Sequence, residues 1–176
     1  MKLYSFTALE IAMSTRMRRL APAGMLTALL LAASQPSWAA DFGPVTGLQG
    51  CPDFTISVSG TGGNQVTRVI KTKNGFTRSV TGGDGFILTF KNESTGKSIQ
   101  VPTNGSVTTA TVAPDGSTTF KLTGQNVFIF FGTDTGGART VLYTGNAVIA
   151  NDPSGKSTFQ SLSGKQQNLC PALAAP

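Results

Sequence analysis

The segment Gln65-Val-Thr-Arg-Val-Ile-Lys-Thr-Lys-Asn-Gly-Phe-Thr-Arg-Ser-Val-Thr81 decides the fold class. Its two halves are rich in Val, Ile and Thr, which fit a pleated strand and lose rotamer freedom in a helix. Asn74-Gly75 separates the halves and suits a type I′ turn, because both central residues of that turn need positive φ. The segment therefore predicts a β-hairpin of strands 65–73 and 76–81.

Short alternating runs and turn sequences continue along the rest of the chain. Phe54-Thr-Ile-Ser-Val58 places its apolar side chains on one face and its hydroxyls on the other. Turn sequences such as Pro114-Asp-Gly116 and Thr123-Gly124 recur about every 8–12 residues. Gly145-Asn146 is interpreted as either a turn or a bulge. The other expected strands cover 86–91, 97–101, 106–113, 117–122, 126–131, 139–144, 147–150 and 157–163. The pattern predicts an all-β fold, an antiparallel β-sandwich or small β-barrel of about ten short strands.

The N-terminal part of the chain has the composition of a signal peptide. Three arginines within 16–19 precede an apolar run over 23–33, which is shorter than the roughly 20 residues that span a bilayer. Small side chains at Ser37 and Ala39 occupy the positions that a signal peptidase recognises. We expect a signal peptide over 1–39 with cleavage between Ala39 and Ala40, and the bond after Ala40 is the alternative.

The predicted processing changes the charge of the protein. Residues 40–176 carry ten basic and seven acidic side chains, so the mature net charge is +3 instead of +6. The high isoelectric point is then weak evidence for nucleic-acid binding, and we expect no nucleic-acid partner. Lys71, Lys73 and Arg78 are the one local basic group, interpreted as a solvated strand face.

Residues 1–12 contribute none of the features that a signal peptide needs for export, which suggests that translation starts at Met13 or Met17.

Two cysteines define the predicted domain. In an exported protein the pair Cys51 and Cys170 predicts a disulfide bond. The domain organisation is then a tail over 40–50, a single domain over 51–170 and a second tail over 171–176. In the alternative interpretation, Leu48-Gln-Gly-Cys51 is a lipobox and Cys51 is lipidated, which leaves Cys170 without a partner.

Catalytic chemistry is sparse in this sequence. The chain contains no histidine, which excludes Ser/His and Cys/His nucleophile pairs and imidazole metal sites. We predict no catalytic, cofactor or metal site. Asp134-Thr-Gly136 resembles the triplet of aspartic proteases, but Asp, Thr and Gly are also ordinary hairpin residues, and the hairpin interpretation is favoured. Two glycosylation sequons, Asn92-Glu-Ser94 and Asn104-Gly-Ser106, lie at turns where we expect them to be accessible.

Several strand-and-turn stretches carry a resemblance. They are Asn74-Gly-Phe-Thr-Arg-Ser-Val-Thr-Gly-Gly-Asp-Gly-Phe-Ile-Leu-Thr-Phe-Lys-Asn92, Phe130-Phe-Gly-Thr-Asp134, Leu142-Tyr-Thr-Gly-Asn146 and Leu169-Cys-Pro-Ala-Leu173. Together they resemble small, uncharacterised, secreted β-rich proteins of actinobacteria. The resemblance implies an actinobacterial export route and a β domain, and it carries over no function and no site residue.

Three functional hypotheses follow from these features. The first is a secreted, extracellular β domain without enzymatic activity or a stable membrane anchor, acting as a binding or surface-interaction module at a cell surface. The second is a carrier that holds a small apolar ligand inside a β-barrel lined by Phe86, Phe90, Phe128 and Phe130. The third is a secreted hydrolase that uses only Asp, Glu, Ser or Lys.

Overall fold

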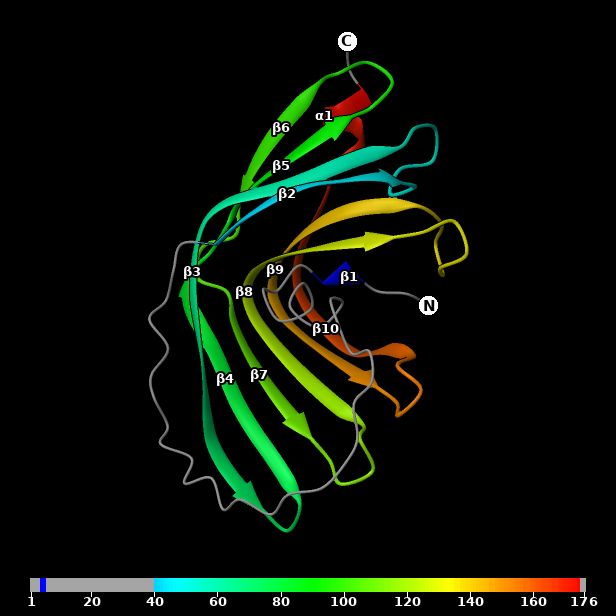
Figure 1. Ribbon diagram of the computed structural model, residues 1–176. Coiled ribbons are helices and arrows are strands. Elements are labelled where there is room, and N and C mark those ends of the chain that lie inside the picture. Colours follow the sequence, from blue (N-terminus) through cyan, green and yellow to red (C-terminus); the bar gives the residue numbers. More distant parts are fainter. Residues whose placement is uncertain (1–3, 6–39, 175–176) are drawn as a thin grey trace, which may run out of the picture.

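The computed structural model describes residues 4–5 and 40–174, and almost all of them lie in antiparallel strands (Figure 1). The all-β prediction is confirmed, although several strands are longer than expected. The strands are β1 (Tyr4–Ser5), β2 (Ala40–Leu48), β3 (Ile56–Lys73), β4 (Phe76–Asp84), β5 (Ile87–Asn92), β6 (Ser98–Pro102), β7 (Val107–Val112), β8 (Thr118–Phe130), β9 (Arg139–Asn151) and β10 (Ser157–Asn168). One short helix, α1 (Cys170–Ala174), follows them.

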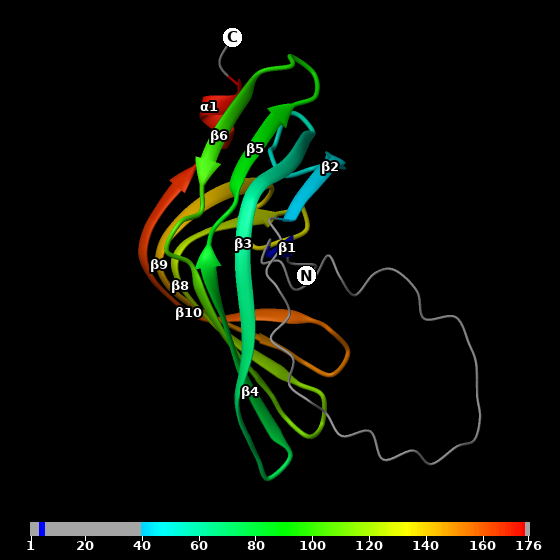
Figure 2. The same cartoon turned by 60° about the vertical axis from the view of Figure 1, so that its left-hand side comes forward.

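A single continuous sheet folds over on itself. Its strand order is β10-β9-β8-β7-β4-β3-β5-β6, with β2 added to β3 and β1 added to β8. The 18-residue strand β3 joins the two layers, because 56–61 pairs with β5 whereas 64–73 pairs with β4. Figures 1 and 2 show β2, β5 and β6 at one end and the curved sheet of β4 and β7–β10 below them. The sheet does not close on itself, so the architecture is sandwich-like.

The core consists of two clusters on opposite faces of β8. Val127 and Ile129 point into the first cluster, which includes residues from β3, β5, β6 and α1. Phe128 and Phe130 point to the other face, where they pack with residues of β8 and β9 such as Tyr143. All four of these β8 side chains are buried. The end of β8 is therefore buried on both of its faces.

The predicted disulfide bond joins Cys51 to Cys170, and their Cα atoms are 5.7 Å apart. Both cysteines belong to the first core cluster, together with the fully buried Leu173 of α1. The asparagine Asn92 donates a hydrogen bond from Nδ2 to the Leu173 carbonyl oxygen over 3.2 Å, which also fixes α1. Because its sulfur is in the bridge, Cys51 is not lipidated, and the lipobox interpretation is wrong.

The expected tails are ordered, which corrects the sequence-based boundaries. Residues 40–48 form β2, and Val45 and Leu48 lie opposite Val58 and Ile56 of β3. The backbone of β3 offers an open edge there, and strand pairing satisfies the polar groups of β2. At the other end, the disulfide bond and the buried Leu173 hold the residues that follow Cys170. The predicted signal peptide over 1–39, including its cleavage residue Ala39, lies outside the described residues except for β1.

Three glycines explain why the strands are longer than expected. Gly124, Gly145 and Gly164 lie opposite one another across β8, β9 and β10, with φ of 83°, 151° and 152°. A Cβ at Gly145 would collide with the backbone oxygen of Ser163. Glycine kinks of this kind curve a sheet without ending its strands. The turn expected at 123–124 and the turn or bulge expected at 145–146 are therefore bends inside β8 and β9, where the strand pairing continues without a register shift.

One of the two sequons is not accessible in the fold. Asn92 is only 2% exposed, and its Oδ1 accepts the backbone N–H of Ser94 over 2.9 Å. The side chain is buried because it closes the β5–β6 turn and also binds α1. The expectation of accessibility is therefore wrong for Asn92, whereas Asn104 is exposed as expected.

Candidate functional site

The second half of β3 and its partner β4 form an arm at one end of the molecule. We define the β3–β4 arm as residues 65–83. The turn at its tip contains Asn74 and Gly75 with φ of 52° and 77°, which confirms the predicted hairpin. Among the described residues, β4 also pairs with β7, whereas β3 has no second neighbour beyond Gly63. In both cartoon views the tip lies at the end opposite α1 (Figures 1 and 2).

The pairing of the arm places its charged side chains on one face. Arg68 lies opposite Val80 and Lys71 lies opposite Arg78, with a bulge between Val69 and Lys71. Opposite residues share a face, and every second residue of β4 returns to that face. We call this side the cationic face, and its members are the basic Arg68, Lys71, Lys73 and Arg78 and the apolar Val66, Ile70, Phe76 and Val80.

The other side of the arm has a different chemistry. It carries Thr67, Ser79 and Thr81, which lie on the opposite face by strand alternation. The hydroxyl oxygens of Thr67 and Thr81 are 2.7 Å apart and share a hydrogen bond. Val69, which is 66% exposed, lies opposite Ser79 and shares this face. The two faces therefore differ in charge, because one combines four cations with apolar groups and the other combines hydroxyls with Val69.

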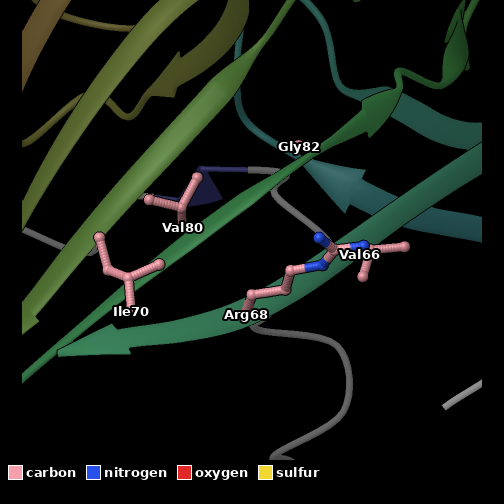
Figure 3. A pocket seen from close by; sticks show the side chains of 5 residues that line it. All are labelled: Val66, Arg68, Ile70, Val80 and Gly82. Atoms are coloured by element: carbon pink, nitrogen blue, oxygen red, sulfur yellow. The ribbon is translucent and has the colours of Figure 1, made fainter. Parts of the chain in front are cut away.

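A shallow pocket of about 480 Å³ lies on the cationic face (Figure 3). Its lining consists of Val66, Arg68, Ile70, Val80 and Gly82. Both aliphatic residues of β3 in this lining lie on the open edge of the sheet and are exposed to solvent, Val66 to 36% and Ile70 to 54%. Exposed aliphatic groups at an edge favour association with a partner, and here a guanidinium accompanies them.

Positive charge is concentrated on the arm. Residues 65–83 contain four basic and no acidic side chains, so their net charge is +4. Residues 40–64 and 84–176 together have six basic and seven acidic side chains, a net charge of −1. Asp84 lies just outside the arm, at its base. Lys121 of β8 shares the cationic face, because it lies opposite Thr109, which in turn lies opposite Val80.

The arm cations differ from Arg139, the first residue of β9. Arg139 donates from Nη1 to the carbonyl oxygens of Thr135 and Gly137 over 2.9 and 3.0 Å, and its guanidinium lies 3.8 Å from the centre of the Phe130 ring. Arg139 therefore has a structural role. By contrast, the four cations of the arm make no ion pair with any described residue, which leaves their charge available to a partner.

The loop carboxylates stabilise their own turns. Asp134 accepts the backbone N–H of Phe131 at Oδ2 over 2.8 Å. Residues 134–136 lie in the connection between the antiparallel strands β8 and β9, in agreement with the hairpin interpretation. Asp115 accepts hydrogen bonds from the hydroxyl and the backbone N–H of Ser117, and these bonds lower the pKa of Asp115. Within 4–5 and 40–174, no group of three or more Cys, Asp or Glu side chains could hold a metal ion.

Sequence reasoning found part of the cationic face and missed the rest. Lys71, Lys73 and Arg78 were expected to form a group, and the structure brings them together. Strict alternation places Arg68 on the side opposite Lys71, but the bulge at Ile70 moves both to one side. The hairpin turn could have predicted the Lys71–Arg78 pair, whereas no sequence signal marks the bulge.

The phenylalanines of the carrier hypothesis do not form one group. Phe86 and Phe90 belong to the first core cluster, whereas Phe128 and Phe130 belong to the second.

The helix α1 spans five residues, and no described helix has the length and apolarity to cross a membrane. Comparison of the chain with protein-family models, curated proteins and solved structures finds no match.

Proposed function

We propose that the chain is exported and works outside the cell as a non-catalytic module that binds a negatively charged surface through its cationic face. The observation that carries this proposal is the separation of charge, +4 on the arm against −1 on the rest of the mature chain. The four cations share one face and are exposed. Such a distribution orients a protein toward an anionic partner and accelerates their encounter.

Export is supported by two independent features. Residues 1–39 have the charge, apolar run and small residues of a signal peptide. The Cys51–Cys170 bond is typical of proteins that fold in an oxidising compartment. We propose that cleavage follows Ala39.

The alternative functions have less support. A carrier needs an apolar interior, but the candidate phenylalanines pack on opposite faces of β8 in a sheet that stays open. A hydrolase that lacks histidine needs converging carboxylates, whereas Asp115, Asp134 and Asp152 each bind the backbone of their own turn. A binding module requires neither feature.

The proposal is tested by chromatography of the processed chain on dextran sulfate resin. In one variant Arg68→Gln and Arg78→Gln remove two arm charges, and in the matched control Lys156→Gln and Lys165→Gln remove two charges elsewhere. We expect the arm variant to elute at a clearly lower salt concentration than the control, because the arm supplies four of the cations on the face that contacts the polyanion, whereas Lys156 and Lys165 lie elsewhere. Equal elution of the two variants would mean that net charge alone explains retention, and the proposed function would be wrong.

A further inference from the structure

We infer that the negatively charged partner of the cationic face is an anionic lipid bilayer, an inference that rests on the proposed function and names its ligand class. The argument starts from the apolar members of that face. Ile70 is 54% exposed and Phe76 is 48% exposed, and Phe76 lies opposite Lys73. A soluble polyanion would be bound by the cations alone. A bilayer interface, by contrast, accepts apolar and cationic side chains together.

The pocket supports the same ligand class. Its walls are the aliphatic side chains of Val66, Ile70 and Val80, and Arg68 supplies the charged group (Figure 3). This combination matches an amphiphile with a phosphate near the guanidinium and a hydrocarbon segment against the aliphatic walls. The long stems of Arg and Lys allow their charged ends to stay at headgroup level while smaller apolar groups lie deeper.

The charge outside the arm determines how the protein would lie on a bilayer. The remaining mature chain has a net charge of −1, so an anionic leaflet does not attract it. The opposite face, with Thr67, Ser79 and the exposed Val69, has no cation and would stay in water. The arm then docks through its cationic face, which Lys121 of β8 shares, and the α1 end points away from the lipid (Figure 2). Each Lys or Arg near an anionic leaflet strengthens binding by roughly fivefold, which makes four cations sufficient for reversible attachment.

The test uses the processed chain with its disulfide bond intact and measures co-sedimentation with two kinds of vesicle. One kind contains equal amounts of phosphatidylglycerol and phosphatidylcholine, and the other is pure phosphatidylcholine. The decisive variant combines Ile70→Ser and Phe76→Ser, which removes apolar contact and keeps every charge. Both side chains are exposed, and circular dichroism verifies that the variant is folded. Its elution from dextran sulfate resin is measured in parallel.

We expect the unmodified chain to co-sediment with the anionic vesicles and not with the pure phosphatidylcholine vesicles. The Ile70→Ser, Phe76→Ser variant should bind anionic vesicles at least about tenfold more weakly and elute from the resin at an unchanged salt concentration. Unchanged vesicle affinity of this variant, or equal binding to both kinds of vesicle, would overturn the inference. If the resin experiment still distinguishes the arm variant from its control, the proposed function stands and the partner is a soluble or polymeric anion. If it does not, both proposals fail.

Discussion

Lys71 lies directly opposite Arg78 across β3 and β4, so two positive side chains form one cross-strand pair. Like charges in that arrangement repel each other and destabilise the sheet. No described carboxylate forms an ion pair with either side chain. The arrangement is unfavourable for the isolated protein, and an anionic partner would relieve the repulsion on binding. The pair therefore links the stability of the arm to its proposed function.

Replacing one member of this pair by an acid should stabilise the fold and weaken binding. In Lys71→Glu the repulsion becomes an attraction, and we expect the free energy of unfolding to rise by about 0.2–1 kcal/mol. Urea unfolding measures this change, and retention on dextran sulfate resin should fall. The matched control is Lys165→Glu on β10, where the opposite residue is the uncharged Thr144. If both variants gain the same stability, the Lys71–Arg78 repulsion is not a significant term.

The disulfide bond should contribute a large share of the stability. It joins residues 119 positions apart, and closing a loop of that length restricts the unfolded chain by about 4–5 kcal/mol in the chain-entropy model. We expect the double variant Cys51→Ser, Cys170→Ser to lose stability of that order in guanidinium unfolding. The reduced wild-type chain is the control and should behave like the variant. If the double variant and the reduced wild-type chain unfolded at the same denaturant midpoint as the oxidised wild-type chain, core packing alone would hold α1.

The sequence predicted the turns better than the lengths of the strands. Asn74-Gly75 was placed correctly, because a type I′ turn needs two adjacent residues that tolerate positive φ. Gly124 and Gly145 gave the same local signal but lie within strands. The difference depends on alignment with glycines of neighbouring strands, which local sequence does not encode. The position of Arg68 was unpredictable for a related reason, since a single-residue bulge decides its face.

The aligned glycines provide a direct test of the bend. Gly145 has φ of 151°, and a Cβ there would meet the Ser163 oxygen of the next strand. We expect Gly145→Ala to lower the free energy of unfolding by about 2 kcal/mol or more, because both the backbone conformation and the close approach become unfavourable. The control is Gly132→Ala, where a Cβ meets no atom within 4 Å and φ is not in the positive range. Similar losses in both variants would contradict a special role for Gly145.

Asn92 should be essential for stability, although its sequon suggests a surface residue. Its amide binds the Leu173 carbonyl oxygen, and its Oδ1 accepts the backbone N–H groups of Ser94 and Thr95. Removal of these bonds leaves buried polar groups unpaired, so Asn92→Ala should cost about 1–3 kcal/mol in chemical unfolding. The control Asn104→Ala alters an exposed asparagine and should change stability little. The reverse order of the two effects would contradict the buried role of Asn92.

Acid should destabilise the protein through its turn carboxylates. The hydroxyl of Ser154 and the backbone N–H of Lys156 lower the pKa of Asp152 below its ordinary value of 3.8, and Thr55 and Gly47 lower the pKa of Glu93 below 4.5. A lowered folded-state pKa means that the unfolded chain binds protons more readily. The stabilising contribution is therefore complete above the ordinary value and is lost as the pH falls through the lower folded-state value. We expect the thermal midpoint to decrease below about pH 4.

The variant Asp152→Asn identifies the contribution of one carboxylate to this acid response. The neutral amide keeps a hydrogen-bond acceptor but cannot gain a proton, so the variant should unfold at a lower temperature than the wild type near neutral pH. As the pH falls through the lowered folded-state pKa, the wild-type Asp152 becomes protonated and the two midpoints should converge. Thermal unfolding followed by circular dichroism across this pH range measures the difference. A gap between the two midpoints that stays constant down to the lowest pH would show that the charge of Asp152 does not contribute, because only a charge-dependent term disappears on protonation.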